Sequence, residues 1–128
     1  MTLRRKAGLA ALLLGTALLA GCAGTPEFRT LEARVVSQTP LTLGPEAELR
    51  VSLEREDGGV IAETRQRRLG GAPIPVRLSY DARSLAQGDA ALHAEIREAG
   101  RLRYRQTEPR PFAPGMGEPV TLTLESLD

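Results

Sequence analysis

The chain has 128 residues and is almost balanced in charge, with 17 basic and 16 acidic side chains and a formal charge of +1. This balance argues against general nucleic-acid binding, which depends on neutralising phosphates with a surplus of Lys and Arg. One histidine and one cysteine are too few to supply the converging ligands of a zinc site, so we expect no metal site.

The first residues have the layout of an export signal. A basic start at 4–6 precedes an apolar core at 7–20 and small residues before Cys22. As a helix, the 15 residues between Lys6 and Cys22 would span about 22 Å, less than the roughly 30 Å hydrocarbon core of a bilayer. The segment is therefore predicted to be a signal peptide and not a permanent membrane span.

The apolar run ends in Leu19-Ala20-Gly21-Cys22, which resembles the lipobox of bacterial lipoproteins. The resemblance implies cleavage between Gly21 and Cys22, a diacylglycerol on the Cys22 sulfur and an acylated amine on the same residue. Each buried methylene contributes about 0.8 kcal/mol, and stable attachment needs more than one chain. We therefore expect Cys22 to carry a covalent lipid that incorporates palmitate.

These features divide the chain into a lipoprotein signal peptide at 1–21, a lipidated tether at 22–29 and one domain at 30–128. Removal of the leader with its three basic residues leaves 107 residues, with 14 basic against 16 acidic side chains and a formal charge of −2. This length suits one core and is short for two ordinary domains. Because the cysteine is used for lipid, the domain must depend on apolar packing and strand pairing.

Apolar residues recur at every second position along most of the domain, which is the pattern of half-buried strands. The clearest predicted strands, with their buried positions, are 47–54 (Ala47, Leu49, Val51, Leu53), 73–80 (Ile74, Val76, Leu78, Tyr80), 91–98 (Leu92, Ala94, Ile96) and 120–126 (Val120, Leu122, Leu124). Weaker examples lie near residues 31 and 100, and the stretch from Val60 is weaker still.

Turn signals separate these strands. Asp57-Gly58-Gly59, Glu98-Ala99-Gly100 and Gly70-Gly71 each predict a tight hairpin turn. Pro109 and Pro111 are placed in a connecting stretch, where a missing N–H is harmless.

A single short helical piece is predicted at 81–87, capped by Asp81. The remainder predicts an all-β domain of about seven short, mostly antiparallel strands. We expect a single β-sandwich of the immunoglobulin or transthyretin type, with a small barrel as the alternative.

Few side chains in the domain can exchange protons or attack a substrate. His93 is the only histidine and is predicted on the polar face of its strand. Glu54 and Glu56 share a strand face, as solvated carboxylates commonly do, and no glycine-rich phosphate loop is present. We therefore expect no enzyme activity and no cofactor other than the lipid on Cys22.

Arg101, Arg103 and Arg105 alternate along one predicted strand, and Arg65 and Arg67 repeat the arrangement. They predict either a charged outer face that keeps the sheet soluble or a binding patch for anionic lipid, glycan or an acidic peptide. Both interpretations stay open.

The loop at 108–118 is a further candidate for binding. It contains Phe112 and Met116, two large apolar side chains between prolines and glycines. They could anchor a peptide that adds itself to the domain as a strand.

Four segments together resemble the YbaY/YscW family of small bacterial lipoproteins: TPLTLGPEAELRVSLE, PIPVRLSYD, ALHAEIREAGRLRY and PVTLTLES. The resemblance covers roughly residues 31–127. It implies a β-sandwich on the periplasmic side of the outer membrane and, for the pilotin members (type III secretion lipoprotein chaperones), assistance to a secretin ring. The first strand and the link RQTEPRPFAPGMGEP depart from the family pattern.

Ala23 follows the predicted lipidated cysteine, and the absence of an aspartate there favours sorting to the outer membrane. We expect a monomeric, non-catalytic lipoprotein at the periplasmic face of the outer membrane that binds another envelope component in envelope integrity or assembly. Two alternatives remain: a pilotin-like chaperone for an outer-membrane secretin, and a module that binds anionic lipid or glycan.

Overall fold

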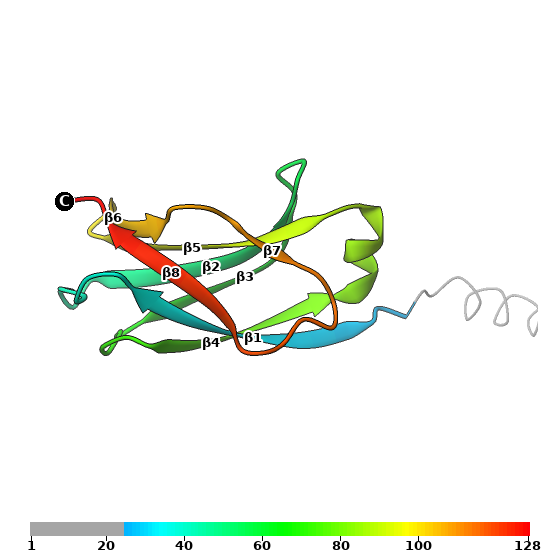
Figure 1. Ribbon diagram of the computed structural model, residues 1–128, viewed down its shortest axis with the longest axis horizontal. Helices are drawn as coiled ribbons and strands as arrows, with labels where there is room; N and C mark the ends of the chain where they lie inside the picture. Colours follow the sequence, from blue (N-terminus) through cyan, green and yellow to red (C-terminus); the bar gives the residue numbers. More distant parts are fainter. Residues whose placement is uncertain (1–24) are drawn as a thin grey trace, which may run out of the picture.

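The computed structural model describes residues 25–128, whose regular elements are strands apart from one short helix (Figure 1). The strands are β1 (Phe28–Ser37), β2 (Ala47–Arg55), β3 (Val60–Arg67), β4 (Ile74–Asp81), β5 (Ala90–Glu98), β6 (Arg101–Gln106), β7 (Arg110–Phe112) and β8 (Val120–Ser126), with one 3-10 helix, η1 (Ala82–Gln87). The predicted signal peptide, its cleavage site at Gly21 and the lipid on Cys22 lie outside the described residues.

The alternating pattern predicted the main strands correctly. β2, β4, β5 and β8 coincide with the four clearest predictions, and every buried position named for them is buried. The three weaker predictions are also strands, β1, β6 and β3. β1 begins at Phe28, two residues before the expected start of the domain.

The predicted helical piece is confirmed as η1. The Asp81 carboxylate accepts hydrogen bonds from the Arg83 N–H at 3.0 Å and from the Glu27 N–H at 3.2 Å. A carboxylate at this position satisfies backbone donors that the first helical turn leaves free. The same side chain therefore lies at the end of β4, caps η1 and binds the backbone just before β1.

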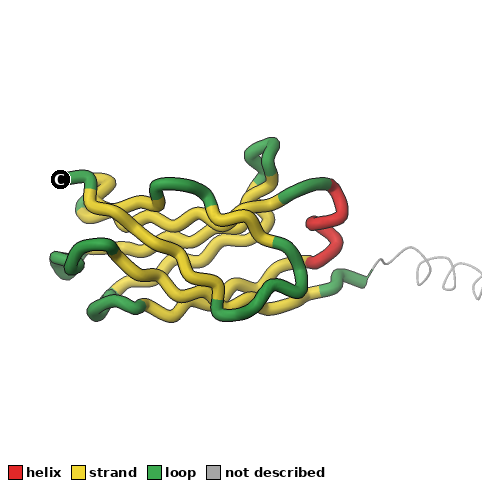
Figure 2. The backbone as a smooth tube through the Cα atoms, in the orientation of Figure 1, coloured by secondary structure: helices red, strands yellow, loops and turns green. Residues whose placement is uncertain are grey.

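All strands except β7 lie on one hydrogen-bonded path in the order β3-β2-β5-β6-β8-β1-β4, and β7 pairs with β5 beside it. The sheet curls until its edge strands β3 and β4 approach each other without pairing (Figure 2). The expected sandwich of two separate sheets is therefore corrected to a sheet nearly closed into a barrel. The reason is β6, which pairs with β5 on one side and β8 on the other and so continues the pairing where two sheets would separate.

One pairing in the sheet is parallel. β1 lies parallel to β8 with Ala33 opposite Val120 and Ser37 opposite Leu124, and its other edge is antiparallel to β4. Strands from opposite ends of the domain thus lie side by side in the sheet, an arrangement that local turn signals do not encode.

Two of the three predicted hairpin turns are confirmed. Gly58, with φ +92°, lies in the turn between β2 and β3, and Ala99 and Gly100 both have positive φ in the turn between β5 and β6. The prediction at Gly70-Gly71 is wrong, because the connection there runs from β3 to β4, which are opposite edges of the sheet and do not pair.

β7 was not predicted from the sequence. Pro111 was placed in a connecting stretch, but it lies in β7 opposite Ala91 of β5. Proline has no N–H to give to a ladder, so it fits a strand only at an edge or where its nitrogen points away from the partner. β7 meets that condition because it has only one partner strand.

One apolar core fills the interior of the curled sheet. Its largest fully buried side chains are Leu31, Val35, Leu49, Val51, Leu53, Leu78, Leu92, Ile96, Val120, Leu122 and Leu124. Full burial of one such side chain contributes about 1.5–3 kcal/mol. The polar end of buried Tyr104 is satisfied, since its hydroxyl accepts a hydrogen bond from the Thr42 N–H at 3.0 Å.

Candidate functional site

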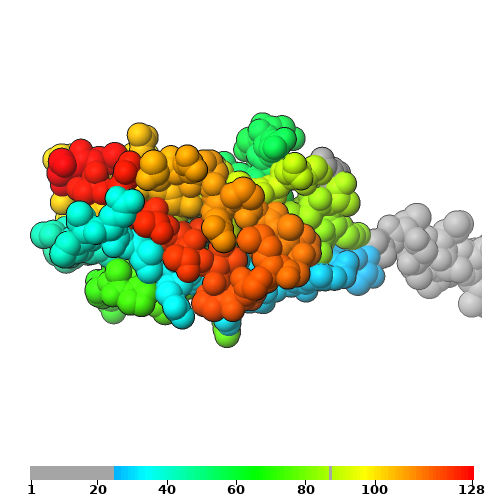
Figure 3. Space-filling model, in the orientation of Figure 1, coloured from blue at the N-terminus to red at the C-terminus, as the bar shows by residue number. Residues whose placement is uncertain are grey.

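A groove of about 740 Å³ lies beside β7, and we call it the β7 groove. It is lined by the end of β2 with the following turn, by the first half of β5 and by the segment 109–116. Figure 3 shows the chain after β6 (orange) lying on the surface of the molecule.

The floor of the β7 groove is apolar, and Ala90 and Ala91 contribute only methyl groups to it. Ala90 and Ala91 of β5 pair with Phe112 and Pro111 of β7. Phe112 is only 8% exposed and meets the Tyr80 ring edge to face, with ring centroids 5.7 Å apart and an interplanar angle of 84°. This contact fixes β7 to β4 across the core, so the groove wall has a firm support.

The wall formed by β7 ends in a turn at 113–116, which is held by hydrogen bonds between Ala113 and Met116. The Ala113 N–H donates to the Met116 sulfur at 3.2 Å, and the Met116 N–H donates to the Ala113 carbonyl at 3.3 Å. Met116 is half-buried against the core. Its flexible thioether can adapt to different apolar surfaces.

The opposite wall is the turn between β2 and β3. The Arg55 N–H donates to the Gly59 carbonyl at 2.8 Å, and the Gly59 N–H donates to the Asp57 carboxylate at the same distance. The Glu56 N–H donates to the Asp89 carbonyl at 3.2 Å, which ties this turn to the start of β5. Both walls of the groove are therefore held by hydrogen bonds.

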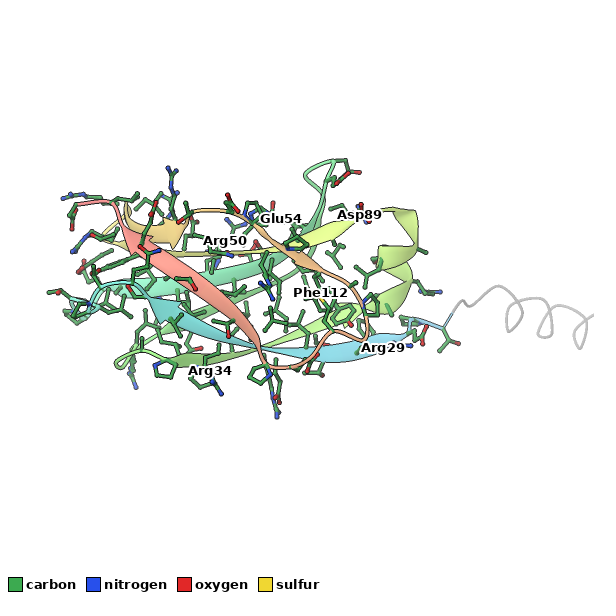
Figure 4. The ribbon with its side chains drawn as sticks, in the orientation of Figure 1. Arg29, Arg34, Arg50, Glu54, Asp89 and Phe112 are labelled. Atoms are coloured by element: carbon green, nitrogen blue, oxygen red, sulfur yellow. The ribbon has the colours of Figure 1, made fainter. Side chains whose placement is uncertain are left out.

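The rim of the groove is acidic. Glu54, Glu56 and Asp89 line it, against the single cation Arg55, whose Nε lies 3.7 Å from the Asp57 carboxylate just outside the lining. Figure 4 shows Glu54 and Asp89 in the same half of the molecule as Phe112. Among residues 25–128, neither Glu56 nor Asp89 has an ion pair or hydrogen bond through its carboxylate.

The structure brings the residues considered for acid–base chemistry to this groove. His93 is half-buried between the inward-pointing Leu92 and Ala94, so its predicted place on the outer face is confirmed, and it lines the groove with Glu54 and Glu56. The nearby Ser52 hydroxyl is 3% exposed and donates to Glu54 at 2.6 Å.

Residues 25–128 contain neither a metal-binding cluster nor a membrane-spanning helix. From residue 25 onward, no group of three or more His, Cys, Asp or Glu side chains is placed to hold a metal ion. Within the same residues, no helix has the length and apolarity needed to cross a membrane.

The three arginines of β6 have unequal surroundings. Arg103 donates to Glu98 at 2.9 Å and lies 3.1 Å from Asp128, and Arg101 lies 3.1 Å from the same aspartate. Arg105 has no ion pair among the described residues. The structure thus compensates the charges of Arg101 and Arg103 and leaves that of Arg105 free on an exposed position.

Arg65 and Arg67 belong to a larger ion-paired face on the outside of β3, β2 and β5. We define the paired face by Glu48, Arg50, Glu63, Arg65, Arg67 and Glu95. Both Arg65 and Arg67 contact Glu48, and Arg50 lies between Glu63 at 3.0 Å and Glu95 at 3.6 Å. Hydrogen bonds from Arg50 and then Arg65 lower the pKa of Glu63, and the bond to Glu63 raises the pKa of Arg50.

Sequence reasoning found parts of the β7 groove but not the groove itself. Phe112 and Met116 were identified as a possible anchor, and both line it. The missed signal was the small pair Ala90-Ala91 at the start of β5. It lies opposite a wall whose position depends on the pairing of β7 with β5.

Comparison with known proteins gives a family. The family model for the type III secretion system lipoprotein chaperone (YscW) matches residues 27–124. A direct comparison with curated proteins finds no match. Among solved structures, an alternative pilotin from the type II secretion system of Vibrio cholerae is similar, with a TM-score of 0.71 and 21% sequence identity over 80% of this chain and 99% of that chain. At this identity the likeness shows a shared fold, whereas the family match spans most of the chain and nearly all of its strands. The chain therefore belongs to the family of type III secretion system lipoprotein chaperones, YscW.

Proposed function

We propose that this protein is a pilotin-like chaperone: a monomeric lipoprotein, held at the periplasmic face of the outer membrane by a lipid on Cys22, that binds an outer-membrane secretin subunit. The observation that carries the proposal is the match of residues 27–124 to a family of lipoprotein chaperones. The shared fold with a pilotin adds support. An envelope lipoprotein of unspecified role is a coarser description, and the chaperone alternative fits the family better.

The proposed activity needs binding and an anchor, and it needs no bond to be made or broken. Five residues lie between Cys22 and Phe28, the first residue of β1. Fully extended, a link of that length reaches roughly 20 Å. A lipid on Cys22 would therefore keep the domain, and any client bound to it, close to the membrane in which the secretin assembles.

The interpretation as a module for anionic lipid or glycan has less support. It depended on the alternating arginines of β6, and two of the three, Arg101 and Arg103, are engaged with Asp128 and Glu98. A guanidinium held in this way has fewer donors available for an external phosphate or carboxylate.

The proposal can be tested by replacing Cys22 and measuring the assembly of the secretin in the outer membrane. Cys22→Ser should abolish incorporation of labelled palmitate and leave the precursor uncleaved, and assembled secretin should disappear from the outer-membrane fraction. Deletion of the gene should have the same effect on the secretin. A Cys22→Ser protein that incorporates palmitate as well as the parent would refute the lipid anchor, and normal assembly of all secretins in the deletion strain would refute the chaperone function.

A further inference from the structure

We infer that the β7 groove is the client-binding site, and that it takes a short segment presenting apolar side chains on one face, flanked by Lys or Arg. The inference rests on the proposed chaperone function for the identity of the client. The chemistry of the segment follows from the groove itself.

The groove offers an apolar surface that the fold does not use. Ala91, Pro111 and Met116 face it, with the edge of Phe112 at its base, and the space of about 740 Å³ is open to solvent. Apolar surface left in a hollow between two hydrogen-bonded walls indicates a binding site more than a packing defect. Side chains of leucine or phenylalanine size would fill it.

The charges of the rim select the flanks of the segment. Glu54, Glu56 and Asp89 stand around the opening, and the one cation, Arg55, lies close to Asp57. On the paired face, by contrast, Glu48 and Glu63 each contact arginines. Glu54 accepts a hydrogen bond from Ser52, whereas the carboxylates of Glu56 and Asp89 have no ion pair or hydrogen bond among the described residues. Carboxylates without a partner beside an apolar hollow create a negative potential, which favours a partner with cationic residues next to its apolar ones.

The backbone of β7 argues against binding by strand addition. An added strand needs N–H donors along a free edge, and Pro109 and Pro111 have none. Only three residues, Arg110 to Phe112, form the strand. The segment is therefore bound through its side chains, which a helical conformation presents from one face.

Binding can be measured with defined peptides. Full-length protein in detergent would be titrated with three short synthetic peptides: an amphipathic peptide of Leu and Lys, one with the same spacing of Leu and Glu, and one of Ser and Lys. We expect the Leu/Lys peptide to bind at least about tenfold more tightly than the other two, because only it satisfies both the floor and the rim. Its affinity should fall with added salt, since exposed charges are screened over about 8 Å at 0.15 M.

Matched variants locate the site. Glu54→Gln, Glu56→Gln and Asp89→Asn together should weaken Leu/Lys binding about tenfold. The control removes three carboxylates elsewhere, Glu32→Gln, Glu46→Gln and Glu125→Gln, and should leave affinity unchanged. Equal affinity in both triple variants would overturn the inference.

A second variant tests the floor without altering charge. Ala91→Phe fills the groove from an outward-pointing position of β5, and Ser79→Phe places the same side chain on an exposed position of β4. We expect Ala91→Phe to abolish peptide binding and Ser79→Phe to preserve it, with both proteins melting as cooperatively as the parent. Retained binding in folded Ala91→Phe protein would also overturn the inference.

Secretin assembly in cells separates this inference from the proposed function. If assembly requires the protein and its Cys22 but tolerates both groove variants, the groove assignment is wrong and the chaperone function stands. If assembly never requires the protein, the client is wrong, whereas selective Leu/Lys binding would still support the chemistry of the groove. Loss of assembly in both groove variants, with normal assembly in their controls, supports the two together.

Discussion

The paired face and the rim of the β7 groove lie on neighbouring parts of β2 and β5. They differ in whether their carboxylates form ion pairs. Along β2 and β3, Glu48 and Glu63 each contact arginines. Just after β2 and just before β5, Glu56 and Asp89 stand beside an apolar hollow with no ion pair among the described residues.

The difference shows what each region is suited to do. Opposite charges on neighbouring strands, directly across for Glu48 and Arg67 and diagonal for Arg50 and Glu63, support the pairing of β2 with β3 and leave little net charge outside. Carboxylates without a counter-charge contribute nothing of this kind, and they attract cations to the surface that they surround. Charge density alone therefore does not identify a binding site; charge that the fold leaves uncompensated is the more useful sign.

The largest expected effect concerns the core that supports both regions. Leu49→Ala removes a side chain that is 1% exposed and should lower the free energy of unfolding by about 2–5 kcal/mol. His93→Ala, on the outer face, should change it by less than about 0.5 kcal/mol. Urea denaturation would compare the two, and a larger loss for His93→Ala would mean that the histidine has a structural role its surroundings do not reveal.

The core strands and their buried positions could be predicted from the sequence. In β2, β4, β5 and β8 the side chains alternate with a period of two, so the buried set follows once a strand is recognised. The cap at Asp81 and the turn at Asp57-Gly58-Gly59 are equally local, and both could be predicted.

The sequence did not predict the features that depend on contacts between distant segments of the chain. The near-closure of the sheet depends on β1 pairing with β8, two strands from opposite ends of the domain. β7 contains a proline and is stabilised by its pairing with β5 and by the packing of Phe112 on Tyr80. The partners of Arg101 and Arg103 depend on where the chain end places Asp128. The groove could not be predicted for the same kind of reason, because its walls come from the end of β2, the start of β5 and the segment 109–116.

The next largest effect separates the arginines of β6. Arg103 is 21% exposed in its side chain and contacts both Glu98 and Asp128, and Glu98 also accepts the Gly44 N–H at 3.0 Å. Arg103→Gln should therefore lower the free energy of unfolding by about 1 kcal/mol, the upper end for a partly exposed ion pair. Arg101→Gln and Arg105→Gln should each cost less than about 0.5 kcal/mol in the same denaturation assay. Equal effects at all three positions would contradict the structural distinction between them.

A pH-dependent effect tests the paired face directly. Arg50 lowers the pKa of Glu63 below its ordinary value of 4.5, so in acid the folded protein binds fewer protons here than the unfolded chain. The stabilisation is complete above that value and is lost as the pH falls through the lowered pKa of the folded state. Arg50→Gln should therefore reduce the fall in urea midpoint between neutral pH and pH values below 4.5. Arg105→Gln is the control, and an identical acid response in both variants would show that the pair with Glu63 makes no contribution.

The smallest expected effect on stability is at the rim of the groove. Glu56→Gln with Asp89→Asn removes two negative charges that contact no arginine among the described residues and adjoin Glu54 in the groove lining. No attractive contact is lost and some like-charge repulsion is relieved, so the free energy of unfolding should stay within about 0.5 kcal/mol of the parent or rise slightly. Arg50→Gln on the paired face, measured beside it at neutral pH, should destabilise. If instead the rim variant unfolded more easily than Arg50→Gln, the rim carboxylates would be structural groups like those of the paired face, and the reason for assigning them to a cationic partner would be lost.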